Sequence, residues 1–154
     1  MQIRIICPGK TKDNYLNVGI EEYIKRVSPW VKVTFLQIPD VKLSNSNNVA
    51  QVKSKEAEII FKHLNPSNYT IALDEIGELL STKKLTNIFL KNMGEKNIDF
   101  VIGGVYGLDK SVRDKVHLVL SFSRMTFTHQ MIRLILTEQI YRCFTIMNNK
   151  KYHY

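Results

Sequence analysis

The residues best suited to chemistry lie in one polar stretch, 121–130, which reads Ser-Phe-Ser-Arg-Met-Thr-Phe-Thr-His-Gln. The apolar run before it, 118–120, has the composition of a strand, and apolar residues recur with helical spacing from 132 to 147. The stretch is therefore a strand-to-helix loop. Its hydroxyl groups can hydrogen-bond a ligand at the carboxyl end of a strand, where open α/β sheets bind small molecules. A capped turn without a ligand would have a similar composition.

A second candidate segment is rich in glycine. Gly103-Gly104-Val105-Tyr106-Gly107 follows the apolar run 98–102, and Leu73 ends a third apolar run, 69–73. Glycines allow a ligand to approach the backbone closely, although paired glycines also form ordinary turns. In a parallel sheet the carboxyl ends of neighbouring strands meet at one edge. We therefore expect Leu73, Gly103 and the loop 122–127 to line one ligand site.

The usual nucleotide motifs are incomplete. Gly9-Lys10-Thr11 resembles the end of a phosphate-binding loop, but the earlier glycine that this motif requires would fall on Arg4. Gly9 also stands alone, so the dinucleotide fingerprint is missing. Cys7 lies in an expected strand and Cys143 on an apolar helix stripe, which favours two buried thiols over a metal site, since zinc sites need three or four clustered ligands. No metal is expected.

Patterns typical of strands and helices alternate along the chain. Strands are expected at 2–7, 31–35, 69–73, 98–102 and 118–120, and helices at 16–27, 49–64, 82–93, 110–115 and 131–147. The Asn- and Ser-rich segment 39–48 is expected to be a loop. The chain contains no convincing linker or repeat. We expect one domain, 1–154, with an α/β fold: a mostly parallel sheet with helices on both faces.

Charge points to a polyanionic partner. Twenty-two Lys and Arg residues exceed fourteen Asp and Glu residues, giving a net charge of +8. This imbalance favours nucleic acid over an anionic membrane. No apolar stretch approaches the roughly 20 residues of a spanning helix, and the N-terminus resembles a strand instead of a signal peptide. We expect a cytoplasmic protein.

Four motifs in a fixed order resemble a known family. They are Ile102-Gly103-Gly104-x-x-Gly107-Leu108, the stretch from Leu120 to Gln130 with Met-Thr-Phe-x-His-Gln, Glu138-Gln139-x-Tyr141-Arg142, and the terminal Tyr152-His153. Together they resemble the RlmH family of the SPOUT superfamily, bacterial methyltransferases that modify N3 of a pseudouridine in 23S rRNA. The family usually has proline where this chain has Thr128. The threonine hydroxyl could cap the following helix instead.

The resemblance implies a set of functional residues. S-adenosyl-L-methionine would be held by Leu73, Gly103, Phe122, Ser123, Arg124, Met125, Thr126 and Phe127. Candidates for handling the acceptor base are His153, Tyr152, Arg142, Arg133 and His129. The resemblance also implies a deep C-terminal trefoil knot and a homodimer. The substrate would be 23S rRNA in the assembled ribosome, with no DNA, membrane or metal involved.

Several alternatives remain at this stage. His129 could be a helix-start histidine that is hydrogen-bonded locally, Arg142 could form a surface ion pair, and Arg133 could pair with Glu138 inside the protein. A basic RNA-binding module without catalysis would instead use exposed lysines such as Lys53. A nucleotide hydrolase would use Gly9-Lys10-Thr11. The binding module predicts RNA binding without affinity for the cofactor. The hydrolase predicts binding of ATP.

Overall fold

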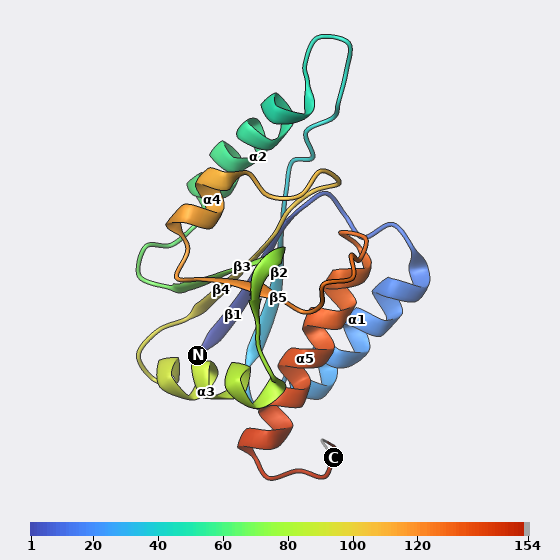
Figure 1. Ribbon diagram of the computed structural model, residues 1–154. Helices are drawn as coiled ribbons and strands as arrows, with labels where there is room; N and C mark the ends of the chain where they lie inside the picture. Colours follow the sequence, from blue (N-terminus) through green and yellow to red (C-terminus); the bar gives the residue numbers. More distant parts are fainter. Residues whose placement is uncertain (153–154) are drawn as a thin grey trace.

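The computed structural model describes residues 1–152 and contains one five-stranded sheet between two layers of helices (Figure 1). The elements in chain order are β1 (Gln2–Pro8), α1 (Asn14–Val27), β2 (Lys32–Ile38), α2 (Val49–His63), β3 (Tyr69–Leu79), α3 (Thr82–Asn92), β4 (Ile98–Ile102), α4 (Lys110–Lys115), β5 (Leu118–Ser121) and α5 (Met131–Met147). The strand order is β2-β1-β4-β3-β5, and every pairing is parallel. The predicted parallel α/β architecture is confirmed.

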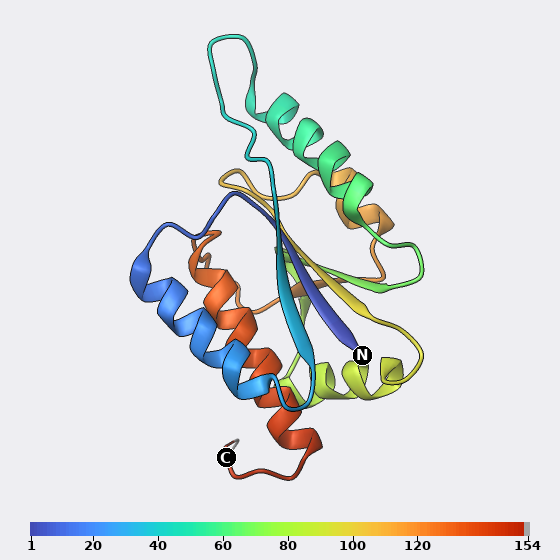
Figure 2. The ribbon, with the colours of Figure 1, turned by 180° about the vertical axis from the view of Figure 1, so that it is seen from behind.

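Alternation along the strands assigns the helices to the two faces of the sheet. Ile5 and Cys7 belong to the core cluster that includes buried residues of α1, α3 and α5. Ile6, between them, packs with buried residues of α2 and α4 on the other face. Successive strand residues point to opposite faces, so a strand buried on both sides needs apolar residues throughout. Figures 1 and 2 show α1 and α5 lying side by side, away from α2 and α4.

One strand is longer than the sequence pattern indicated. The apolar run of β3 ends at Leu73, but the strand continues to Leu79 and pairs again with β5 at Leu120 and Ser121. Gly77 lies so close to β5 that an added Cβ would be 2.7 Å from backbone atoms of Val119 and Leu120. Most of this extension is exposed, and three acidic residues and a glycine interrupt its apolar residues, so it gave no strand signal.

The start of α5 confirms the proposed role of Thr128. Its Oγ1 accepts a hydrogen bond from the Met131 backbone N–H at 3.1 Å, so the hydroxyl satisfies the first amide of the helix from two residues before the N-cap position, which Gln130 occupies. Farther along, α5 packs closely on α1, where a Cβ on Gly19 would be 2.8 Å from Leu134 Cδ1. On the α1 side of this helix pair, Tyr15 is 65% exposed and Val18 is 58% exposed.

Candidate cofactor pocket and a separate aromatic cluster

A cavity of about 740 Å³ lies where β3, β4 and β5 end. This volume is typical of small-molecule sites. Of the residues predicted to hold a cofactor, seven line the cavity: Leu73, Gly103, Phe122, Ser123, Met125, Thr126 and Phe127. The parallel sheet thus brings together three segments that are far apart in the chain, as expected from the carboxyl-end rule.

Arg124 is the exception among these residues. It does not line the cavity, and its guanidinium donates a hydrogen bond to the backbone carbonyl of Glu75 on the β3 extension. The side chain therefore ties the loop after β5 to β3. Sequence reasoning could not separate Arg124 from its neighbours because the extension that supplies the carbonyl was not predicted.

The loop after β5 holds its shape through its own serines. Ser121 Oγ donates to the Ser123 carbonyl at 2.8 Å, and the Met125 N–H donates to Ser123 Oγ at 2.9 Å. These bonds form a compact local turn. They leave Met125 and Phe127 77% and 45% exposed, so two large apolar side chains stand at the cavity wall.

The glycines of the loop after β4 are needed by the loop's own packing. A Cβ on Gly103 would be 2.7 Å from the carbonyl carbon of Gly107 and 2.8 Å from the Leu108 nitrogen. The missing side chain therefore makes room for the loop's own backbone, while Gly103 also lines the cavity. Gly107, with φ +77°, donates its N–H to the Gly104 carbonyl at 3.1 Å and closes the turn.

Four charged residues of the cavity were not predicted for it from the sequence: Lys53, Asp74, Glu75 and Arg113. Arg113 pairs with Asp74 at 3.0 Å while donating to the Leu108 carbonyl at 2.9 Å. Asp74 directly follows the apolar run of β3, which is a usable signal for a site residue. Lys53 and Arg113 lie on helices, where no sequence spacing relates them to the loops.

His129 lines the same cavity, and its surroundings favour the uncharged imidazole. Its pKa is lowered from the ordinary value, chiefly by burial and then by the charges of Arg133 and Lys12, with Asp40 acting in the opposite sense. The imidazole is therefore neutral at physiological pH. Its ring makes no hydrogen bond to any group in residues 1–152, so a local structural hydrogen bond does not account for it there.

Arg133 does not pair with Glu138 as one alternative predicted. Its side chain is fully buried and donates to the carbonyls of Pro8 at 2.6 Å, Gly9 at 3.1 Å and His129 at 3.1 Å, and to Thr11 Oγ1 at 3.1 Å. The sequence could not reveal these partners because they lie more than 120 residues away, except for His129. A guanidinium with no exposed surface is not available to RNA, so Arg133 secures the loop after β1 and the start of α5.

Two other predicted residues, Arg142 and Tyr152, meet in an aromatic cluster. Glu138 Oε1 accepts hydrogen bonds from Arg142 at 2.5 Å and from the Tyr152 hydroxyl at 3.1 Å. The Tyr152 ring lies 4.8 Å from the Arg142 guanidinium carbon and 4.7 Å from the Tyr141 centroid, and its hydroxyl is 3.4 Å from that of Tyr23. Burial, Tyr23 and Glu138 raise the pKa of Tyr152, so its hydroxyl stays protonated. His153 lies outside the described residues.

The cluster and the cavity occupy different parts of α5. Ile132 lines the cavity, whereas Glu138 and Arg142 follow six and ten residues later. A rise of 1.5 Å per residue separates them from Ile132 by roughly 9 and 15 Å along the helix axis. Within one chain, the Arg142–Tyr152 cluster therefore does not complete the cavity.

The described residues also bear on the rival interpretations. Neither Gly9, Lys10 nor Thr11 lines the cavity, and Arg133 holds the Gly9 carbonyl. In residues 1–152 no three His, Cys, Asp or Glu side chains group as metal ligands would. No helix in the same range is long and apolar enough to cross a membrane.

Known proteins resemble the chain over nearly its full length. Residues 1–153 match the family described as "Predicted SPOUT methyltransferase". Relatives named ribosomal RNA large subunit methyltransferase H, from Halothermothrix orenii and Finegoldia magna, are 42% and 44% identical, with 99% of each chain covered. A putative methyltransferase H from Methanococcus vannielii is 45% identical with the same coverage.

Solved structures show the same fold at low sequence identity. A probable methylase family protein from Haemophilus influenzae has a TM-score of 0.55 and 15% identity, covering 99% of this chain and 70% of its own. A probable methyltransferase from Bordetella pertussis has a TM-score of 0.56 and 10% identity, covering 92% and 95%.

Proposed function

Because the chain belongs to the SPOUT methyltransferase family, we propose that it transfers a methyl group from S-adenosyl-L-methionine to N3 of a pseudouridine in the 23S rRNA of assembled ribosomes. The observation that carries the proposal is the position of the loop 121–128. This loop bears the most specific family motif, and it lines the large cavity at the carboxyl ends of three parallel strands.

The cavity suits an adenosyl donor in size and chemistry. Leu73, Ile102 and Leu120 offer apolar contacts for an adenine ring, and the ends of the strands present backbone groups that can bind its polar edge. Leu73, Gly103, Ser123, Thr126 and their loop neighbours would hold the donor. When bound, the donor supplies a methyl group already activated by its sulfonium charge.

The protein's own residues must align the acceptor and remove its N3 proton. His129 is suited to the second task because its neutral ring faces the cavity. Arg142 and Tyr152 belong to the acceptor side, with His153 as a further candidate. Their cluster lies some 9–15 Å along α5 from the cavity residue Ile132, so they would need to act on a neighbouring site.

A two-fold homodimer would resolve this separation. The α1–α5 pair carries exposed Tyr15 and Val18, and Tyr23 of the cluster lies on the same helix α1. Pairing through this face would bury the apolar residues and bring the cluster of one protomer to the cavity of its partner. The family's trefoil knot is part of the same proposal.

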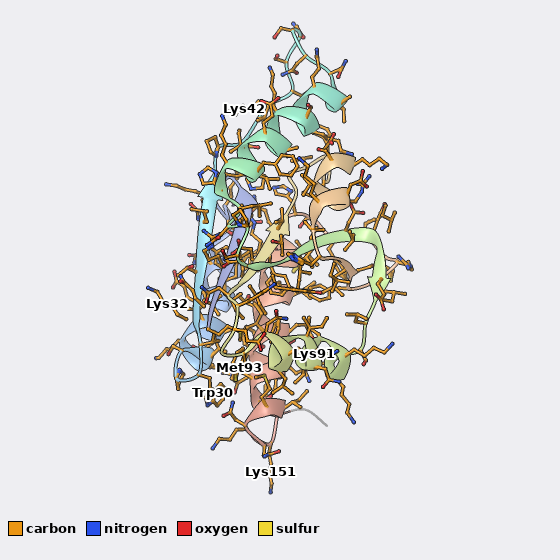
Figure 3. The ribbon with its side chains drawn as sticks, turned by 90° about the vertical axis from the view of Figure 1, so that its left-hand side faces the viewer. Trp30, Lys32, Lys42, Lys91, Met93 and Lys151 are labelled. Carbon is orange, nitrogen blue, oxygen red and sulfur yellow. The ribbon has the colours of Figure 1, made fainter. Side chains whose placement is uncertain are left out.

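RNA recognition in this proposal relies on shape and charge, since no separate RNA-binding domain is present in residues 1–152. Basic side chains are spread over the molecule. Figure 3 shows Lys42 at the α2 end and Lys32, Lys91 and Lys151 toward the opposite end, near Trp30 and Met93. Trp30 stacks on Tyr141 with ring centroids 6.1 Å apart, which favours a packing role for this tryptophan. A ribosomal substrate would place the working protein in the cytoplasm.

Calorimetric titration with S-adenosylmethionine, S-adenosylhomocysteine and ATP is the first test. We expect saturable binding of both adenosyl compounds and not of ATP. Methyl transfer should then be followed on intact ribosomes and on free 23S rRNA, with the modified nucleotide located by mass spectrometry. Only the ribosomes should be methylated efficiently.

Matched serine variants connect this activity to the cavity. Ser123→Ala removes a hydroxyl that holds the cavity loop, whereas Ser46→Ala removes one in an exposed distant loop. We expect Ser123→Ala to bind the donor about tenfold more weakly than the unaltered protein. Ser46→Ala should bind the donor with unchanged affinity. ATP binding alone would instead favour a hydrolase, and salt-sensitive RNA binding without donor affinity would favour a binding module.

A further inference from the structure

Glu56 is a buried carboxylate directly behind the glycine loop that walls the cavity. It lies on α2, is 5% exposed, and its Oε2 accepts the backbone N–H of Gly104 at 3.4 Å. In residues 1–152 no Lys, Arg or His side chain forms an ion pair with it. Burying an unpaired carboxylate is unfavourable, and desolvation accordingly raises the pKa of Glu56. Backbone N–H groups of Gly104 and Val41 act on this pKa in the opposite sense, so the carboxylate's favourable contacts are with the glycine loop and the loop after β2.

The glycine at position 104 fits this carboxylate. A Cβ on Gly104 would lie 2.6 Å from Glu56 Oε1 and 2.9 Å from Oε2. The carboxylate thus occupies the space that any other side chain at 104 would need. Glu56 and Gly104 form a matched pair that brings α2 against the loop 103–107.

The loop between them is a wall shared by two cavities. Val105 and Tyr106 line the large cavity, and they also line a second one of about 300 Å³ on the side of Glu56. Gly103 and Gly104, which carry no side chains, face the large cavity from the same loop. With open space on both sides, few packing contacts hold the wall in place. The contact with Glu56 is consequently well placed to set its position.

We propose that Glu56 is a positioning residue for the methyl donor: its carboxylate holds the Gly104 amide and so fixes the 103–107 wall in the shape that binds the adenosyl group. This inference rests on the proposed function for the identity of the ligand. Glu56 itself lines only the second cavity, so it acts through the loop and not by contact with the donor.

The test compares three variants of the full chain. Glu56→Ala removes the acceptor, Glu56→Gln keeps one oxygen that can accept the Gly104 N–H, and Glu58→Gln makes the same charge change at an exposed site on α2. We expect Glu56→Ala to weaken S-adenosylhomocysteine binding roughly tenfold and Glu56→Gln to restore most of the affinity. The Glu58 variant should bind like the unaltered protein. The Glu56→Ala effect should appear in the KM for the donor, with kcat at saturating donor nearly unchanged.

A double-mutant cycle probes the contact itself. Gly104→Ala should weaken binding in the unaltered background, because its Cβ would collide with the carboxylate. The same substitution should lower the affinity much less in the Glu56→Ala background, because the carboxylate with which the Cβ would collide is absent there. Equal losses in both backgrounds would show that the two residues do not act together and would overturn the proposal.

Hydrogen exchange provides a readout that needs no cofactor. Amides of the segment 103–108 should exchange faster in ligand-free Glu56→Ala than in Glu58→Gln. Faster exchange with unaltered donor affinity, or no change in exchange, would refute the positioning role. If the unaltered protein bound no adenosyl compound, the proposed function would fail, whereas the exchange data would still decide whether Glu56 holds the loop.

Discussion

Replacing Arg133 with methionine should lower the stability of the protein by about 3 kcal/mol. The buried carbonyl of Pro8 and the partly buried carbonyls of Gly9 and His129 would lose their guanidinium donor. An unsatisfied buried acceptor costs about 1–3 kcal/mol, and water can replace part of the loss at the two partly buried carbonyls. Part of this loss is offset, since the variant no longer buries a charge, whose desolvation costs several kcal/mol. Methionine also fills much of the space left by the guanidinium stem. We therefore expect a net loss near the lower end of the summed range.

Urea denaturation followed by circular dichroism measures this loss directly. For a chain of this length, about 3 kcal/mol corresponds to a Tm lower by roughly 6–12 °C. Arg26→Met is the matched control, because Arg26 lies exposed on α1, where it pairs with Glu22 and lies over the Tyr23 ring. It should leave the free energy of unfolding nearly unchanged, because solvent-exposed ion pairs contribute little. Equal stability of the Arg133 variant and the control would refute the conclusion that the buried Arg133 side chain stabilises the contact between the loop after β1 and the start of α5.

Three further predictions concern the proposed reaction. If His129 accepts the N3 proton, the rate of single-turnover methylation should fall only as pH drops through the lowered pKa of His129, below about 6.5. His129→Asn should slow methylation by roughly 10²–10⁴-fold and abolish this loss of rate at acid pH. The same acid loss of rate in the variant would exclude the role. Deleting residues 152–154 should leave donor binding intact in calorimetry and reduce methylation of ribosomes by orders of magnitude, and full activity would make the tail dispensable. Val18→Glu should convert a dimer to a monomer in light scattering, and an unchanged dimer mass would place the interface elsewhere.

Much of the fold followed from local sequence patterns. Apolar runs and helical spacing located all ten elements, with boundaries such as 98–102 and 131–147 matching the structure. These patterns succeed because a strand or helix must present apolar residues at fixed intervals to reach the core. The family motifs likewise identified the loop after β5, and the carboxyl-end rule placed Leu73 and Gly103 beside it.

Other features depended on contacts between distant segments. The extension of β3 past Leu73 was missed because its residues are largely exposed, so they lack an apolar pattern. The same extension draws Arg124 away from the cavity, and Arg133 is directed to the loop after β1 instead of to Glu138. For both arginines, only the packing of the elements decides which partners lie within reach of the side chain.

The sequence by itself therefore determined the class of fold, the family and the segments that form the cavity. Only the tertiary structure decided which side chains complete it, that Glu56 backs the glycine loop, and that Arg142 and Tyr152 form a separate cluster. The physical reason is the range of the interactions involved. Periodic burial is recorded in neighbouring residues, whereas a hydrogen bond between α2 and residue 104 joins positions 48 apart and exists only once the sheet has brought them together.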